Sequence, residues 1–109
     1  MPACSGDHPP DVSEFDVSGL TPVPSDLVKP PRVKESRVQL EYRRLQVVTV
    51  STEPRGGSLV RGEVLPFHVD DSAINQGKVD PGRLRPIGRM GGIDYVRTTD
   101  RFSMIRPKV

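Results

Sequence analysis

The sequence predicts a mainly β protein that is built around one long antiparallel hairpin. Glycine and proline are in excess, with 10 Gly and 12 Pro among 109 residues, about 20% where about 12% is usual. This composition favours turns and irregular β structure over helices. Two long runs rich in alternating apolar residues, 38–50 and 59–69, flank a turn rich in Pro and Gly at 52–57. That pattern is typical of a hairpin that curls into a small barrel.

The two runs carry signs of irregular strands. The first alternates from Val38 to Tyr42 and changes phase at Arg43 and Arg44, which indicates a β-bulge. The second contains Pro66, which has no N–H to donate and therefore places this strand at an edge or at a bulge.

Shorter elements are expected on both sides of the hairpin. Residues 11–20 predict a short helix with Phe15 as a core anchor, and the four prolines of 21–32 predict an ordered, extended strap, with a solvated linker as the alternative. Asp80 and Pro81 are typical of a helix start, and 95–98 predicts a strand. Residues 1–10 are expected to be a disordered N-terminus, which leaves 11–109 as one domain.

Composition argues against several function classes. The net charge is only +2 and no block of like charges occurs, so nucleic acid is not an expected partner. No apolar run approaches membrane-spanning length, and the single cysteine cannot form an internal disulfide. We therefore expect a protein of a reducing compartment, the cytoplasm. Cys4 and His8 form too small a set for a metal site, so no metal ligand is predicted.

A second cluster of reactive residue types, His68, Asp70 and Ser72, does not predict a hydrolase. Neighbours in one strand cannot converge as a catalytic triad does. Because His68 and Asp70 would share a strand face, they are expected to form a hydrogen-bonded surface pair.

The stretch 84–102 contains the best candidate binding site. Gly91 and Gly92 allow a tight turn that brings N–H groups close to a ligand. Arg89 and Arg97 offer planar forks for phosphate or carboxylate, and Tyr95 offers a face for a ring. A phosphorylated, ring-bearing ligand fits this set, although an ordinary turn before a strand explains the same residues.

The chain also resembles the flavin reductase-like family. The resemblance to the C-terminal half of that family rests on Gly62-Glu63-Val64, Phe67-His68-Val69, Lys78-Val79-Asp80-Pro81, the run from Leu84 to Gly92, and Tyr95. The segments 15–25 and 30–33 resemble the family's middle part, so that the match extends from about Asp11 to Pro107.

The resemblance implies a partial FMN-binding split β-barrel that acts as a homodimer. Family members reduce flavin with a nicotinamide nucleotide, NADH or NADPH, or keep FMN as a bound redox group. It further implies that Arg89, Gly91, Gly92 and Tyr95 contact FMN, and that His68 lies near the isoalloxazine or nicotinamide as the candidate catalytic residue.

The N-terminal half of the family has no counterpart in this sequence. Since that half carries most contacts to the FMN phosphate, we expect either a truncated flavin reductase-like protein or a non-catalytic remnant that needs a complementary N-terminal chain. A small β-rich interaction module without redox activity is the third possibility. Whether the isolated chain is an enzyme stays open at this point.

Overall fold

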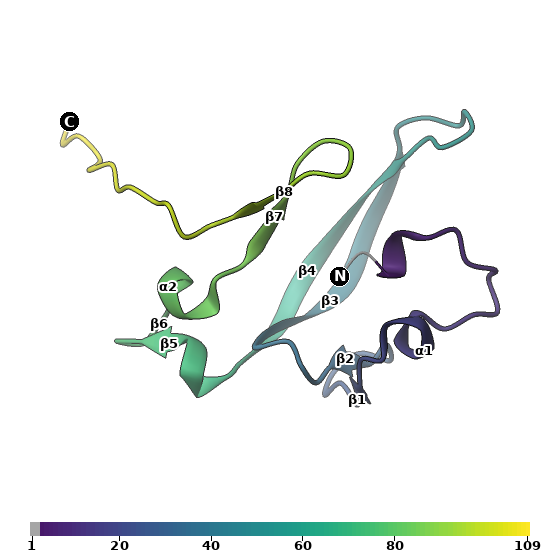
Figure 1. Cartoon of the computed structure of the whole chain (residues 1–109), viewed down its shortest axis with the longest axis horizontal. Helices are drawn as coiled ribbons and strands as arrows, with labels where there is room; N and C mark the ends of the chain where they lie inside the picture. Colours follow the sequence, from purple (N-terminus) through teal and green to yellow (C-terminus); the bar gives the residue numbers. More distant parts are fainter. Residues whose placement is uncertain (1–2) are drawn as a thin grey trace. The chain divides into compact units, whose positions relative to one another are not determined.

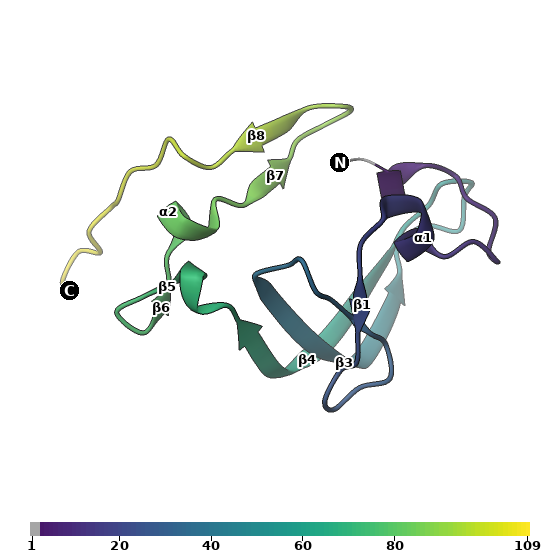
Figure 2. The ribbon, with the colours of Figure 1, turned by 60° about the horizontal axis from the view of Figure 1, so that its bottom comes forward.

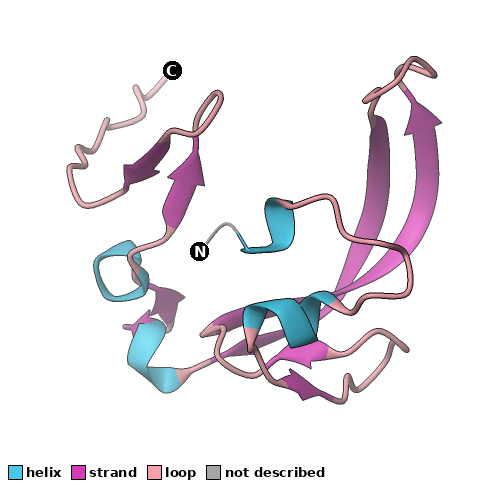
Figure 3. Ribbon diagram, turned by 45° about the vertical axis from the view of Figure 1, so that its right-hand side comes forward, coloured by secondary structure: helices cyan, strands magenta, loops and turns pink. Residues whose placement is uncertain are grey.

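The computed structural model describes residues 3–109; Met1 and Pro2, part of the predicted disordered N-terminus, lie outside the described residues. The chain divides into two compact units, Met1–His68 and Val69–Val109, and each is described by itself. Figure 3 shows short helices and mostly paired strands. The elements are η1 (Ala3–Ser5), α1 (Glu14–Ser18), β1 (Pro22–Val23), β2 (Arg32–Val33), β3 (Val38–Thr49), β4 (Ser58–Val69), η2 (Asp71–Ala73), β5 (Ile74–Asn75), β6 (Lys78–Val79), α2 (Pro81–Leu84), β7 (Ile87–Arg89) and β8 (Tyr95–Arg97).

The dominant feature of the first unit is the long hairpin of β3 and β4 (Figure 1). The two strands pair in a two-stranded sheet, and the Val50 N–H donates to the Gly57 carbonyl at 3.0 Å where the turn begins. The predicted mainly β class and the predicted hairpin are therefore confirmed. All four sheets of the described chain are two-stranded, so the barrel is not closed. The bulge expected at Arg43 and Arg44 stays a prediction.

A proline-rich strap accompanies this hairpin. β1 and β2 pair antiparallel, with Pro22 opposite Val33, and β2 contacts β3. Ser25 donates its hydroxyl to the Pro30 carbonyl at 2.6 Å and closes the loop between them. Figure 2 shows the segment around β1, in dark blue, crossing in front of the β3–β4 hairpin in that view. The strap is thus ordered, as predicted, because its prolines favour extended backbone and its polar groups find local partners.

The predicted helix around Phe15 is present as α1. It ends at Gly19, whose φ of 72° allows the N–H to bond back to the Phe15 carbonyl. Phe15 itself is half-buried and not the fully buried anchor that was expected.

The second unit consists of two small hairpins and two capped turns. β5 pairs with β6 and β7 with β8, both antiparallel. Asp70 accepts from the Ser72 N–H and starts η2. Asp80 accepts from the Gly82 N–H at 2.7 Å and starts α2 with Pro81 in its first turn, as predicted.

Little of the described chain is buried. Ala73 is the buried hydrophobic residue and Glu41 the buried charged one. Large apolar side chains stay exposed on β3 and β4, among them Leu40, Tyr42, Leu45, Val47, Val48, Leu59, Val60 and Phe67. None of the helices among residues 3–109 is long and apolar enough to cross a membrane.

Candidate functional site

The second unit brings four of the predicted site residues into one hairpin. Arg89 ends β7, Tyr95 begins β8, and the two are direct cross-strand partners. Directly opposed residues project from the same face of a sheet, so the guanidinium and the phenol share one face. Ile87 and Arg97 form the next pair but one in the same ladder, and their side chains therefore project from that face too.

The turn of this hairpin has room for a ligand. Gly92 has a φ of 62°, and a Cβ added at Gly91 or Gly92 would meet no atom within 4 Å. Tyr95 is about half exposed. Within the described chain, the Arg89 side chain has neither a hydrogen bond nor an ion pair, which leaves its charge available to an anion. A cavity of about 210 Å³ lies at the end of the hairpin away from this turn and is lined by Arg85, Ile87, Arg97, Thr98 and Thr99, so that neither Arg89 nor Tyr95 lines it.

The first unit contains the best-built polar cluster of the protein. Glu41, near the start of β3, is 1% exposed, and its carboxylate accepts hydrogen bonds from the N–H groups of Asp26 and Leu27 at 3.0 and 2.7 Å. Nε2 of His68 lies 2.5 Å from Glu41 Oε2. The cluster thus ties the strap to both strands of the hairpin.

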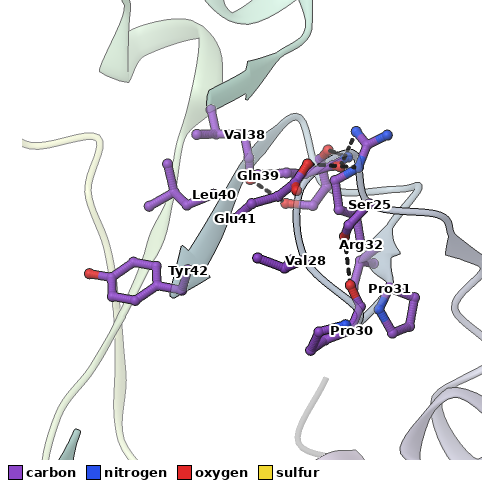
Figure 4. A pocket seen from close by; sticks show the side chains of 12 residues that line it. Ser25, Val28, Pro30, Pro31, Arg32, Val38, Gln39, Leu40, Glu41 and Tyr42 are labelled. Carbon is purple, nitrogen blue, oxygen red and sulfur yellow. Dashed lines mark hydrogen bonds and ion pairs between the residues drawn. The ribbon is translucent and has the colours of Figure 1, made fainter. Parts of the chain in front are cut away.

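Arginine 32 adds a positive charge to the cluster. Its Nε lies 4.0 Å from Glu41 Oε2, while the rest of its guanidinium donates to the Pro24 carbonyl and to Gln39. Figure 4 shows the Glu41 side chain directed towards Arg32, whereas Tyr42 projects away from it. A cavity of about 310 Å³ lies between the strap and β3, and its lining includes Arg32, Glu41 and Tyr42.

The cluster also keeps Glu41 ionised. Burial opposes ionisation, but the two N–H donors and the His68 ring outweigh it and lower the pKa of Glu41 to about 2. These donors therefore stabilise the ionised form of the buried Glu41 carboxylate, which acts as a fixed hydrogen-bond acceptor at neutral pH.

The structure corrects one sequence-based expectation and adds two residues. The hydrogen bond of the His68 ring is made with Glu41, whereas the Asp70 side chain caps η2 by accepting from the Ser72 N–H. Sequence reasoning missed Glu41 and Asp26. The available signal was a carboxylate inside the apolar run of a strand, which has to be paired if that strand is covered.

No protein-family model matches the chain, but individual proteins do. It is 36% identical over 104 residues to an uncharacterised protein of Halalkalibacterium halodurans. The matched region covers 93% of this chain and 49% of that protein. The chain spans about half the length of the curated relatives it matches.

Three solved structures have a similar fold. Nitrilotriacetate monooxygenase component B from Bacillus cereus superposes with a TM-score of 0.83 and 28% identity over 94% of this chain and 52% of its own. The 2-nitrobenzoate 2-nitroreductase of Pseudomonas fluorescens gives 0.80 and 27%, over 98% and 52%. A Shewanella frigidimarina protein named as a flavin reductase with a split barrel domain gives 0.75 and 27%, over 95% and 52%. The chain is therefore a relative of the split-barrel flavin reductases and has the fold of about half of one of their domains.

Proposed function

We propose that this chain is one half of a redox protein that uses FMN, with NADH or NADPH as the reductant, and that it supplies part of the flavin site. The observation that carries the proposal is the similarity, over nearly the whole chain, to solved structures named as a flavin reductase and a nitroreductase. FMN would supply the hydride chemistry, while the protein orients and charges its surroundings.

The β7–β8 hairpin suits such a ligand. The Arg89 guanidinium, which has no hydrogen bond or ion pair among residues 3–109, can bind a phosphate or a ring carbonyl, and Tyr95, on the same face, offers an aromatic surface. The open backbone at Gly91 and Gly92 allows close approach. His68 is proposed as the residue that meets the isoalloxazine or the nicotinamide.

The exposed apolar side chains of β3 and β4 support a second part of the proposal, namely that another chain completes the flavin site. The partner is either a second copy or a chain that supplies the other half of the domain. The contacts available within this chain are few: one charge-assisted hydrogen bond of about 1.5–3 kcal/mol and some stacking. Loss of translational and rotational freedom costs about 4–15 kcal/mol.

We therefore expect the isolated chain to bind FMN with a Kd no tighter than roughly millimolar. Addition of the part of the Halalkalibacterium halodurans protein that this chain does not match should bring the Kd into the micromolar range. Quenching of FMN fluorescence measures both. Arg89→Ala should weaken the restored binding, and Arg106→Ala, in the same unit but outside the hairpin, should leave it unchanged.

Two outcomes would contradict parts of this proposal. Micromolar FMN binding by the isolated chain would show that no complementary half is needed. Equal binding by wild type and Arg89→Ala in the complemented state would remove the β7–β8 hairpin from the flavin site.

A further inference from the structure

The contact between Glu41 and His68 has a definite chemical consequence. An ionised carboxylate has no hydrogen to donate, and Glu41 is ionised at neutral pH because the Asp26 and Leu27 N–H groups and the His68 ring stabilise its charge. At 2.5 Å between Nε2 and Oε2, the hydrogen must therefore reside on Nε2. The ring is then either neutral with Nε2 protonated or fully protonated.

The other ring nitrogen is left for a different partner. Nδ1 of His68 has no hydrogen-bonding partner among the described residues, and the side chain is 22% exposed. Glu41, in contrast, is held on several sides: the strap donates two N–H groups and Arg32 of β2 lies 4.0 Å away. The carboxylate is the fixed member of the pair and the imidazole is the accessible one.

We propose that Glu41 is a positioning residue, which holds the His68 imidazole by Nε2–H and presents Nδ1 to the bound ligand. The identity of that ligand as a flavin or nicotinamide rests on the proposed function, whereas the fixed ring orientation does not. In the neutral ring Nδ1 accepts a hydrogen bond. In the protonated ring the Nδ1–H bond can break as a new bond forms to a basic ligand atom, and the ring returns to the Nε2–H form.

Other charges face this pair and are part of its environment. Asp26 Oδ2 lies 3.7 Å from Nε2, so a second carboxylate also favours a proton at that nitrogen. Arg32 Nε lies 4.0 Å from Glu41 Oε2, the carboxylate oxygen that Nε2 of His68 also contacts. Both charges reinforce the arrangement, because Asp26 attracts Nε2–H and Arg32 helps to keep Glu41 ionised.

A cation site is the competing explanation of the cluster. The ligand atoms of Asp26, Glu41 and His68 lie within 4.8 Å of one another. However, two ligand atoms that each lie about 2.1 Å from one ion are separated by roughly 3 Å or more. The 2.5 Å contact between Nε2 and Oε2 is shorter than that and fits a shared hydrogen.

The test is the tautomeric state of His68 in the full chain, measured by long-range 15N–1H NMR of the imidazoles without flavin. The chain has two histidines, and the exposed His8 serves as the internal reference. In the wild type we expect Nε2 of His68 to be protonated in both the neutral and the charged form of the ring. Glu41→Gln can both donate and accept, so His68 should become a mixture of tautomers, whereas Asp26→Asn should keep the Nε2–H form and His8 should not change.

Several results would overturn the proposal. A wild-type His68 with Nδ1 protonated and Nε2 bare would do so without any variant, as would an unchanged tautomer in folded Glu41→Gln. Loss of the Nε2 proton on addition of one equivalent of Zn²⁺ would assign the cluster to a metal. If the tautomer is as expected but the complemented chain does not bind FMN, the positioning role stands and the proposed function fails. If FMN does bind, the Nδ1 resonance should shift while Nε2–H persists.

Discussion

The exposed apolar side chains of β3 and β4 predict that the chain self-associates. The contribution of one of them, Leu45, to the strength of that association can be calculated. The chain exposes 9803 Å², whereas a compact protein of 12.0 kDa exposes about 6,000 Å². Even two separate compact units of these sizes would expose only about 7,200 Å². The excess of about 2,600 Å² or more is at least as large as the area that each subunit buries in the larger obligate dimers, about 1,000–2,500 Å².

We therefore expect the wild-type chain to form dimers or larger assemblies at micromolar concentration. Leu45 is 58% exposed, and full burial of a leucine side chain contributes about 1.5–3 kcal/mol. Burial of the exposed part would contribute about 0.9–1.7 kcal/mol, and twice that in a symmetric dimer. Leu45→Ser should accordingly weaken the dimer by roughly 20- to 300-fold in Kd.

Sedimentation velocity over a concentration series measures this change. Arg44→Ser is the matched control, since Arg44 is the exposed neighbour of Leu45 on β3 and contributes no comparable apolar area. A wild-type chain that stays monomeric at 100 times these concentrations and unfolds cooperatively on heating would refute the reasoning, as would equal Kd values for the two variants.

Three further predictions concern single groups. The pKa of Glu41 is lowered in the folded state to about 2 from an ordinary 4.5, so the Glu41 carboxylate contributes fully to the free energy of unfolding above about pH 4.5, and this contribution is lost as the pH falls towards 2. Urea unfolding at several pH values should show this loss of stability, and Glu41→Gln should make the free energy of unfolding less dependent on pH over the same range. A Cβ added at Gly62 would run into the Tyr42 ring and would lie 3.1 Å from the Arg43 carbonyl oxygen, so Gly62→Ala should lower the free energy of unfolding by about 1–3 kcal/mol. A Cβ added at Gly57 would meet nothing within 4 Å, so the control variant Gly57→Ala should change the free energy of unfolding by less than about 0.5 kcal/mol. Cys4 and His8 should hold no zinc, and one equivalent of tightly bound zinc that Cys4→Ser abolishes, measured by elemental analysis, would contradict this.

Local chemistry explains why much of the fold could be predicted from the sequence. The strands β3 and β4, the α1 helix and the Asp80 cap all depend on neighbours within a few residues. Alternation, helix caps and proline act over that range. The hairpin that joins Arg89 to Tyr95 is local as well, because the two partners are only six positions apart in the sequence.

Tertiary structure alone decided the partners of charged groups that are far apart in sequence. Glu41 is bonded to Asp26 and Leu27, about 15 residues before it, and to His68, 27 residues after it. In the sequence His68 has a nearer carboxylate in Asp70, and only the folded chain shows that Asp70 caps η2 instead. Strand alternation assigns a side chain to a face but cannot tell which distant segment covers that face, and this is why the pattern predicted the hairpin while the fold assigned the ionised partner of His68.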